Sequence, residues 1–457
     1  MTITFETLGL SKPVLEALAL KDYTQPSPIQ AQAIPSLIQG RDLLGIAQTG
    51  TGKTAAFMLP SIDRLSGGRR PQSRTCRMLV LAPTRELASQ IAASARAYAK
   101  FTPLNVATVF GGTSLHKNRQ DLARGVDVLV ATPGRLLDLI DQGAVTLAKL
   151  EILVLDEADQ MMDLGFIHAL RRIVAMLPRE RQTLFFSATM PKTIRELAGK
   201  FLTDPVEVKV TPEATTAERV TQFVTFCNQG EKQALLTLTL KATTIDRALV
   251  FTRTKHGADR VVRQLAASGI AANAIHGNKS QPQRERALGE FRSGKVPILV
   301  ATDIAARGID VSGVSHVFNF ELPNVAEQYV HRIGRTARAG NNGIAIAFCS
   351  DEERGDLRGI EKLIRQRIEV TPPPAGLAAE AARIKATRPA QPPAPERGER
   401  HERPRHDRHE QRPHGERRPR RNGGGSGPNH RTANGGVRKG EVGRHSGRVR
   451  RASDVRV

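Results

Sequence analysis

The sequence predicts two α/β domains in tandem, each built on a doubly wound parallel sheet, followed by a C-terminal tail that does not fold. Three observations support this prediction. Short apolar runs alternate with segments of helical period, a pattern typical of α/β folds. The alternation thins once, near residue 211, and then restarts. It ends near residue 371, where apolar residues become sparse.

The first predicted domain covers residues 1–210. Its apolar runs are short, as expected for strands buried on both faces of a parallel sheet. Helical segments such as Glu86–Lys100 separate them. The predicted strands are Met78–Ala82, Val106–Phe110, Val126–Ala131, Ile152–Leu155 and Thr183–Phe186.

The second predicted domain covers residues 219–371 and follows a polar linker, residues 211–218, that contains a proline. The same alternation of strand-like and helical segments restarts there, so we expect a second domain of the same class. Its predicted strands are Thr221–Phe226, Ala248–Phe251, Ala272–Ile275, Pro297–Ala301, Val314–Phe318 and Ile344–Phe348.

The tail, residues 372–457, contains no Phe, Tyr or Trp and is rich in Pro, Arg, His and Gly. Such a segment cannot bury enough apolar surface to fold, so we expect it to be disordered. The whole chain carries a net charge of +23. From Thr371 onward there are 21 basic and 9 acidic residues, a net charge of +12. Nucleic acid is a better partner for this charge than a membrane, because no basic helix with an aromatic face is present.

The composition also excludes several classes of protein. No apolar stretch is long enough to span a bilayer, and the N-terminus lacks the basic and apolar regions of a signal peptide. We therefore expect a cytoplasmic protein without membrane contact. The three cysteines, Cys76, Cys227 and Cys349, are odd in number and far apart, which argues against disulfides or a zinc cluster.

Residues Ala47–Thr54 read AQTGTGKT and resemble a phosphate-binding loop. They follow the apolar segment Asp42–Ile46 and precede a helical one, which is the context that such a loop needs. Gly50 and Gly52 let the backbone curl around phosphate, while the lysine reaches the β and γ phosphates and the threonine hydroxyl can bind Mg²⁺. The first glycine of the general pattern is replaced by Ala47, so an ordinary Gly/Thr turn is the alternative.

Residues Asp156–Asp159 read DEAD and follow the apolar run Leu150–Leu155. Carboxylates at the C-terminal end of a parallel strand line ligand crevices. Asp156 is suited to hold Mg²⁺ through water, and Glu157 to polarise the water that attacks a phosphate. The alternative is an acidic helix cap, since Asp and Glu favour the first turn of a helix.

Further short motifs follow in order along about 350 of the 457 residues. Phe5 and Tyr23–Gln30 stand upstream of the phosphate loop. The others are Pro83–Leu87, Gly111–Gly112, Thr132–Arg135, Ser187–Thr189, Val250–Arg253, His276–Gly277 with Gln281 and Arg284, Ala301–Asp303, Arg307–Asp310 and His331–Arg338. With these motifs the chain resembles the DEAD-box ATP-dependent RNA helicases. Asp22, Ser27 and Ala337 depart from the residues usual in that family.

The resemblance implies two RecA-like domains and the cofactors ATP and Mg²⁺. Thr54 and Asp156 would hold the metal. Independently of the resemblance, the Gln30 side chain offers a donor and an acceptor that match those of adenine. The alternative interpretation is that Gln30 only lies on the solvent-exposed face of an amphipathic helix. Phe5 or Tyr23 would stack on the base. The residues expected to bind the nucleotide are Phe5, Tyr23, Gln30, Ala47, Gln48, Thr49, Gly50, Thr51, Gly52, Lys53, Thr54 and Asp310.

The resemblance also implies that catalysis is shared between the domains. Arg335 and Arg338 would reach the γ-phosphate as arginine fingers, although a basic surface patch is the alternative. A relay would report bound ATP to the RNA face; its members could instead be ordinary cap or core polar groups. The expected catalytic set is Lys53, Asp156, Glu157, Arg335 and Arg338 together with the relay residues Asp159, Ser187, Thr189 and His331.

RNA contacts implied by the resemblance come from both domains. Small residues, hydroxyls and arginines suit phosphates and 2′-hydroxyls rather than base edges, so binding should not depend on sequence. A helix start at Pro133 is compatible with this role, because a helix N-terminus binds phosphate. The expected contacts are Thr84, Arg85, Gly112, Thr132, Gly134, Arg135, Arg253, Gly277, Gln281, Arg284, Thr302 and Asp303.

The expected function is therefore that of an ATP-dependent RNA helicase that unwinds short duplexes or remodels RNA–protein complexes. The compact core and basic tail most resemble the bacterial RhlE-type subgroup. We expect a monomer, with the tail as an auxiliary RNA anchor and ribosome-assembly or RNA-decay proteins as partners. Two rivals stay open: an RNA-binding or annealing protein that does not hydrolyse ATP, and a DNA translocase.

Overall fold

The computed structural model describes residues 3–48, 50–210, 220–306, 309, 311, 313–337 and 343–386. It contains two seven-stranded sheets, one in residues 3–210 (lobe 1) and one in residues 220–386 (lobe 2). Every strand pairing within them is parallel, as the sequence predicts. The predicted linker, residues 211–218, and the part of the predicted tail from 387 to 457 lie outside the described residues.

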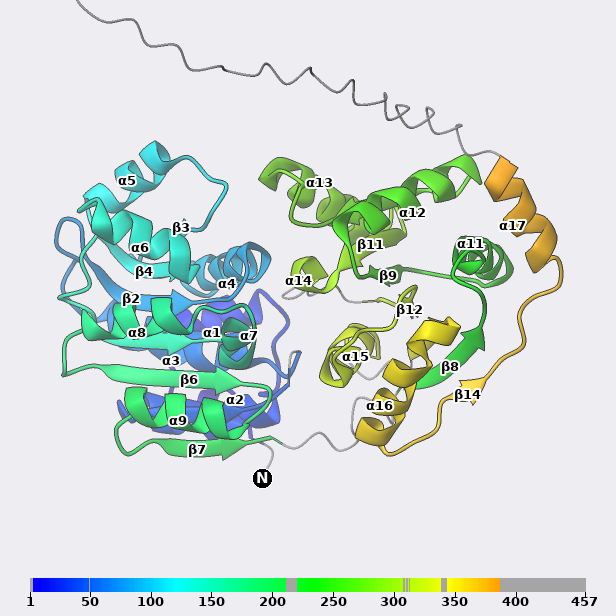
Figure 1. The fold of residues 1–457 in the computed structure, drawn as a ribbon. Helices are drawn as coiled ribbons and strands as arrows, with labels where there is room; N and C mark the ends of the chain where they lie inside the picture. Colours follow the sequence, from blue (N-terminus) through cyan, green and yellow to red (C-terminus); the bar gives the residue numbers. More distant parts are fainter. Residues whose placement is uncertain are drawn as a thin grey trace, which may run out of the picture. The chain divides into compact units, whose positions relative to one another are not determined.

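The sheet of lobe 1 has the strand order β3-β4-β2-β5-β6-β1-β7 (Figure 1). Its central strands are buried on both faces, because parallel strands joined by helices are covered on each side. The edge strand β7 was absent from the sequence prediction. The strands are β1 (Leu43–Ile46), β2 (Cys76–Leu81), β3 (Val106–Val109), β4 (Val126–Ala131), β5 (Ile152–Leu155), β6 (Gln182–Ser187) and β7 (Val206–Lys209).

Helices cover both faces of this sheet. Side chains of successive strand residues point to opposite faces, so the alternating residues of β2, β4, β5 and β6 build two separate apolar cores. Helices α1 to α4 pack into one core and α5 to α9 into the other. The helical elements are η1 (Glu6–Leu8), α1 (Lys12–Ala19), α2 (Pro28–Ile38), α3 (Lys53–Ser66), α4 (Arg85–Tyr98), α5 (Leu115–Ala123), α6 (Pro133–Asp141), α7 (Ala158–Asp163), α8 (Ile167–Ala175) and α9 (Lys192–Phe201).

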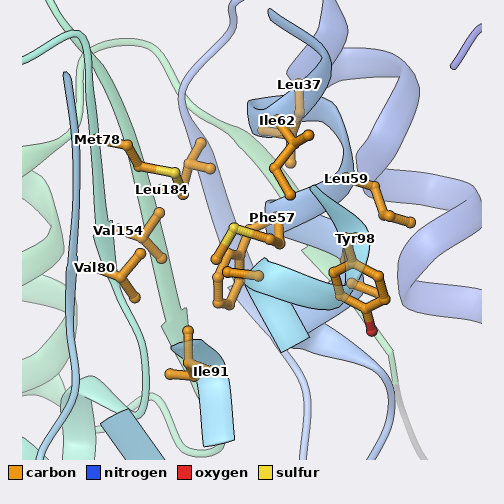
Figure 2. Packing of buried hydrophobic residues seen from close by; sticks show 14 of the residues in the cluster. Leu37, Phe57, Leu59, Ile62, Met78, Val80, Ile91, Tyr98, Val154 and Leu184 are labelled. Carbon is orange, nitrogen blue, oxygen red and sulfur yellow. The ribbon is translucent and has the colours of Figure 1, made fainter. Parts of the chain in front are cut away.

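The helix that follows the phosphate loop is the best buried of these. Ten of the fourteen residues of α3 are buried, including Phe57, whose ring centroid lies 5.4 Å from that of Phe186. Figure 2 shows this core, where α2, α3 and α4 meet strand side chains such as Val154 and Leu184. Burying side chains of this size contributes roughly 1.5–3 kcal/mol each. The packing therefore fixes where the phosphate loop must turn.

The sheet of lobe 2 has the order β10-β11-β9-β12-β13-β8-β14, which repeats the order of lobe 1 strand for strand. Each strand of one lobe thus has a counterpart in the other: β8 for β1, β9 for β2, β12 for β5 and β13 for β6. The strands are β8 (Val220–Phe226), β9 (Ala248–Thr252), β10 (Ala272–Ile275), β11 (Ile298–Thr302), β12 (His316–Asn319), β13 (Gly343–Cys349) and β14 (Glu369–Val370).

The C-terminal boundary of lobe 2 differs from the prediction. The sequence placed the tail from residue 372, but α17 (Leu377–Ala386) packs on α11, and Leu377 contacts an apolar core of lobe 2.

The remaining helical elements of lobe 2 are α11 (Lys232–Ala242), α12 (Lys255–Ala267), α13 (Gln281–Arg292), α14 (Asp303–Ala306), α15 (Ala326–Ile333), η2 (Asp351–Glu353) and α16 (Arg354–Ile364).

Two further expectations concern the cysteines and the membrane. All three cysteines are free thiols; Cys76 and Cys349 are buried and Cys227 is half-buried. Among the described residues, no helix combines the length and the apolar character needed to cross a bilayer.

Candidate nucleotide and RNA site

The predicted ATP motifs follow three neighbouring strands of lobe 1. The sheet places β6 between β5 and β1, with Leu155 paired to Phe185 and Ile46 paired to Ser187. The backbone N–H of Ala47 donates to the Ser187 carbonyl at 3.1 Å. The phosphate loop, the DEAD segment and the Ser-Ala-Thr segment therefore lie together at the C-terminal edge of the sheet, where ligands of open α/β sheets bind.

The phosphate loop turns as its glycines predict. Gly50 and Gly52 have φ values of 88° and 92°, the left-handed region that side chains with a Cβ rarely adopt. Lys53 begins α3, is 5% exposed, and donates from Nζ to the Ala47 carbonyl at 3.0 Å. Its Nζ lies 4.0 Å from Asp156 Oδ1. A turn without function would leave a lysine exposed, so the buried cation favours the phosphate-loop interpretation.

The Gln30 side chain is buried rather than on the wet face of its helix. Its Oε1 accepts from the Ser27 backbone N–H at 2.9 Å, and its Nε2 donates to the Gly52 carbonyl at 3.1 Å. Ser27 Oγ donates to the Thr51 carbonyl at 2.8 Å. Both polar atoms that would select adenine are thus engaged within the chain, Oε1 at the cap of α2 and Nε2 in a bond that links α2 to the phosphate loop. Ser27 was overlooked as a functional residue, although the Ser-x-x-Gln pattern of a capping box indicates this pair.

The two aromatic candidates differ in accessibility. Phe5 is 3% exposed and belongs to the core, whereas Tyr23 is 38% exposed. Their rings stack with centroids 6.4 Å apart, and the Tyr23 hydroxyl lies 3.4 Å from the Tyr98 hydroxyl. Tyr23 is therefore the ring that a base can reach in this conformation.

The first two residues of the DEAD segment, Asp156 and Glu157, are energetically unfavourable in the folded protein, one because of burial and the other because of its backbone conformation. Burial raises the pKa of Asp156 to about 6; Lys53 opposes this rise and Glu157 adds to it. Glu157 adopts the left-handed conformation with φ 55° and ψ 52°, which costs about 1–2 kcal/mol for a residue with a Cβ. It precedes α7, but its side chain does not cap that helix. Burial and backbone strain at adjacent carboxylates favour a reactive site over a helix cap.

Asp159 joins the DEAD segment to the Ser-Ala-Thr segment. Its Oδ2 accepts from the backbone N–H groups of Ala188 and Thr189 at 3.1 and 2.8 Å, and from the Thr189 hydroxyl at 2.9 Å. Ser187 Oγ donates to the Thr189 carbonyl at 2.8 Å. Three members of the predicted relay therefore form one hydrogen-bonded cluster in lobe 1.

The predicted RNA contacts of lobe 1 follow the other half of the same sheet edge, after β2, β3 and β4. Thr84 caps α4 by accepting from the Leu87 backbone N–H at 3.2 Å. Gly112 has a φ of 87°, and a Cβ built on it would lie 2.4 Å from Arg85 Nη1. The double glycine thus makes room for this guanidinium, and burial lowers the pKa of Arg85.

The predicted contacts after β4 form the start of α6, as expected from Pro133. Thr132 precedes the helix and is 8% exposed. Arg135 Nη1 donates to the Thr113 carbonyl at 2.9 Å and to Asn118 Oδ1 at 3.2 Å. Gly134 has open space around its would-be Cβ and a φ outside the left-handed region. Neither packing nor backbone conformation therefore requires glycine there.

The predicted RNA contacts of lobe 2 occupy the counterpart half of its sheet edge, after β9, β10 and β11. Gly277 follows β10 and has open space where a Cβ would be. Gln281 begins α13 and donates from Nε2 to Glu285 Oε1 at 3.0 Å. Arg284, on the same helix, donates from Nη1 to the His276 carbonyl at 3.1 Å. Thr302 is the last residue of β11.

Asp303 was predicted as an RNA contact, which stays a prediction; the structure shows that its carboxylate forms an ion pair. Its two carboxylate oxygens accept from Nε and Nη2 of Arg332 at 2.6 and 2.8 Å. Arg332 is 1% exposed and also donates to Asn319 Oδ1 at 3.0 Å. A carboxylate bound on both oxygens by a buried arginine anchors α14 to α15. Arg332 was not assigned a role from the sequence.

Of the two predicted arginine fingers, Arg335 lies within the described residues and Arg338 does not. Arg335 is 5% exposed, with Nη1 donating to the Ile309 carbonyl at 3.1 Å and Nε to the His331 carbonyl at 3.2 Å. It is thus not part of a surface patch. His331 lies on α15, and its place in the relay stays a prediction. Thr49, Asp310 and Arg338 lie outside the described residues.

Comparisons with known proteins agree with this geometry. A DEAD/DEAH box helicase family model matches residues 27–197, and a helicase conserved C-terminal domain model matches residues 230–340. The chain belongs to the DEAD-box helicase family.

Two curated helicases illustrate the relationship. The DEAD-box ATP-dependent RNA helicase CshA of Geobacillus kaustophilus is 41% identical over 371 residues, which cover 81% of this chain and 79% of the relative. The RNA helicase CrhR of Synechocystis sp. is 44% identical over 386 residues, covering 84% of this chain and 77% of that protein.

A solved DEAD-box structure has the same fold. Dbp5 of S. cerevisiae, bound to RNA and ADP BeF3, matches with a TM-score of 0.73 and 32% identity, covering 84% of this chain and 99% of that one.

The residues of this helicase fit a Mg²⁺ ion. Asp156 Oδ1 is buried and has no hydrogen-bond partner within the described structure. No group of three or more His, Cys, Asp or Glu suited to a metal occurs in the described part of the chain. Mg²⁺ commonly takes only one or two protein ligands and completes its shell with water and phosphate oxygens. Asp156 and Thr54 suffice for such a site.

The raised pKa of Asp156 predicts a pH-dependent gain in stability for Asp156→Asn. The folded protein holds this proton more tightly than the unfolded chain, whose Asp pKa is near 3.8. The ionised carboxylate therefore lowers stability above pH 6, and this loss disappears as the pH falls toward 4. In protein free of nucleotide and metal, the variant should gain ~3 kcal/mol at pH 8 and roughly half of that at pH 5.

Urea unfolding at the two pH values measures this difference. Asp121→Asn, which changes an exposed carboxylate on α5, is the matched control and should alter the free energy of unfolding little at either pH. An equal gain for Asp156→Asn at pH 8 and pH 5 would contradict the raised pKa of this buried carboxylate.

Gly134 provides a test of the RNA face that separates binding from folding. Gly134→Ala should keep or slightly raise stability, since Ala is favoured over Gly in a helix by roughly 0.5–1 kcal/mol. It should nevertheless raise the RNA concentration for half-maximal ATPase stimulation by about tenfold, equivalent to ~1.4 kcal/mol, because the new methyl group would stand where the RNA backbone is predicted to pass. Gly199→Ala, in α9 and equally uncrowded, is the control. Identical RNA dependence of the two variants would remove Gly134 from the RNA face.

Proposed function

We propose that lobe 1 binds Mg²⁺-ATP at the ends of β1, β5 and β6, and that hydrolysis there drives the unwinding of short RNA duplexes or the remodelling of RNA–protein complexes. As a DEAD-box helicase, the chain is an RNA-stimulated ATPase. The observation that carries the residue assignment is the buried Lys53 ammonium group 4.0 Å from the buried Asp156 carboxylate, with the buried Glu157 next in sequence at the same sheet edge. Bound Mg²⁺ would neutralise charge on the phosphates and orient the γ-phosphoryl group.

Glu157 is assigned the role of orienting and polarising the attacking water. Its side chain does not cap the helix that follows, and it is buried next to Asp156 at the sheet edge where the phosphate loop lies. Such an acid–base role contributes roughly 10²–10⁴-fold to a rate. Arg335 and Arg338 are proposed to stabilise charge on the transferred phosphoryl oxygens.

Asp159 and Thr189 are proposed to pass the state of the ATP site to the RNA face. Their cluster ties the segment that carries Glu157 to the segment after β6, so a shift at the phosphates moves both. The RNA face offers backbone amides at the starts of α4 and α6, a hydroxyl and two arginines. These groups recognise phosphate and 2′-hydroxyl oxygens, which supports binding to RNA without sequence preference.

The subgroup and setting are also proposals. The chain is placed with the bacterial RhlE-type helicases, as a cytoplasmic monomer whose partners act in ribosome assembly or RNA decay. CshA and CrhR, two related bacterial proteins, are named as RNA helicases, which supports an RNA substrate over DNA.

Glu157→Gln tests the proposed mechanism. The amide cannot polarise water as the carboxylate does, so the variant should bind ATP and RNA while its turnover falls by roughly 10²–10⁴-fold. Bound RNA should then leave more slowly with ATP than with ADP, as measured by displacement of a fluorescent RNA. Lys53→Ala is the comparison: it should also lose turnover, but without slowing RNA release. Equal release rates from Glu157→Gln with ATP and ADP would overturn the assignment.

A further inference from the structure

Lobe 2 contains a counterpart of the ATP phosphate site. Its β8 and β13 pair as β1 and β6 do, with Phe226 opposite Cys349 where lobe 1 has Ile46 opposite Ser187. The next backbone N–H, that of Cys227, donates to the Cys349 carbonyl at 3.2 Å, as Ala47 does to Ser187 at 3.1 Å. The two edges can therefore be compared residue by residue.

The phosphate-binding lysine has an equivalent at this edge. Lys53 is the first residue of α3, which follows β1, and Lys232 is the first residue of α11, which follows β8. Lys232 is completely buried, and its Nζ donates to Glu353 Oε2. A buried ammonium group is tolerated only when an anion neutralises it. In lobe 1 the phosphates of ATP are proposed to supply that anion.

The Glu353 carboxylate is surrounded by donors that suit phosphate. It follows β13, the counterpart of the strand that ends at Ser187. Oε1 accepts from the Leu322 backbone N–H at 3.1 Å and lies 3.2 Å from Arg253 Nη2. Oε2 accepts from the backbone N–H and the hydroxyl of Ser350 at 3.0 and 3.2 Å. An ammonium group, a guanidinium, two backbone amides and a hydroxyl form the donor set by which proteins bind phosphate.

We infer that lobe 2 carries an oxyanion site equivalent to the ATP phosphate site of lobe 1, and that the Glu353 carboxylate permanently occupies it. The chain's own side chain thus takes the place of a phosphate group. The 3% exposed Glu353 closes the site against external anions.

The metal position of this second site is also changed. Phe320 donates from its backbone N–H to the Phe251 carbonyl at 3.1 Å, the counterpart of the bond from Asp156 to Leu81 at 3.0 Å. A phenyl ring therefore stands where lobe 1 has its metal-binding carboxylate. Lobe 2 therefore has a lysine that can bind an oxyanion, but it has Phe320 at the position of the proposed Mg²⁺ ligand Asp156. A single anionic group fits this site, whereas Mg²⁺-ATP does not.

The Glu353 carboxylate also contacts Arg253, which the sequence predicts to bind RNA. Arg253 donates from Nε to the Leu322 carbonyl at 2.7 Å and from Nη2 to Asp356 Oδ2 at 2.9 Å, next to Glu353. Its side chain is 34% exposed. Resting on the proposed function, Glu353 would hold this guanidinium in place at the end of β9, on the RNA half of the edge. The oxyanion site itself stands on the contacts of lobe 2 and does not depend on RNA binding.

Rescue of Glu353→Ala by inorganic phosphate tests the inference. Removal of the carboxylate leaves Lys232 buried and without its anion, so the melting temperature should fall and then recover with added phosphate. At phosphate far above its dissociation constant, the saturable recovery should be about 5 °C. Wild type and the double variant Lys232→Met/Glu353→Ala are titrated in parallel, with chloride at matched ionic strength, to remove the general stabilising effect of phosphate.

A saturable rise confined to Glu353→Ala supports the site. An equal rise in all three proteins shows general salt stabilisation and overturns it. If Glu353→Ala does not fold unaided, its refolding from urea is compared with and without phosphate. Recovery with phosphate alone supports the inference, and failure under both conditions contradicts it. Neither ATP nor RNA is present, so the result is independent of the helicase mechanism.

Discussion

The parallel pairing of β1, β6 and β5 is the constraint on which the site in lobe 1 depends. Because parallel strands end at the same edge of a sheet, the loops after these three strands must meet. The register then sets which residues meet: Ile46 opposite Ser187, and Leu155 opposite Phe185. The neighbouring strands β2, β4 and β3 bring the residues predicted to bind RNA to the same edge. One sheet edge thus has an ATP half and an RNA half, which the chain order alone does not place side by side.

Each lobe buries the ammonium group of a lysine, and the two lobes differ in which anion balances its charge. A lysine at the start of a helix is buried by the packing of that helix, and it requires an anion. In lobe 1 we propose that a ligand meets this requirement, because the nearby Asp156 is itself destabilised by burial, which raises its pKa although Lys53 opposes the rise. Lobe 2 meets it internally with Glu353. On these two proposals, the same fold provides a catalytic site in one copy and a closed structural site in the other.

The strands of both sheets, apart from the edge strands β7 and β14, could be predicted from the sequence because buried parallel strands are short apolar runs between helices. The turn at Gly50 and Gly52 was predicted correctly, since only glycine adopts their φ values without cost, while phosphate binding there stays a prediction.

Side-chain partners were harder to foresee. The pairing of Asp303 with Arg332 joins residues 29 positions apart, and no local pattern indicates it. The internal bonds of Gln30 depend on where the phosphate loop lies in space. Strand β14 is two residues long, too short for a periodic signal, but the segment LAAEAARIKA before residue 387 has the composition of a helix and was overlooked.

The central claim is that Asp159 couples the two halves of the sheet edge in lobe 1. It is tested most directly by measuring the affinity for single-stranded RNA with and without a non-hydrolysable ATP analogue, in wild type and in Asp159→Ala. Coupling of this kind is reciprocal, so the analogue should tighten RNA binding by the same factor by which RNA tightens analogue binding. The account predicts a factor of about ten or more in wild type and a factor near one in the variant, with each ligand still binding alone. An unchanged coupling factor in Asp159→Ala would contradict the account.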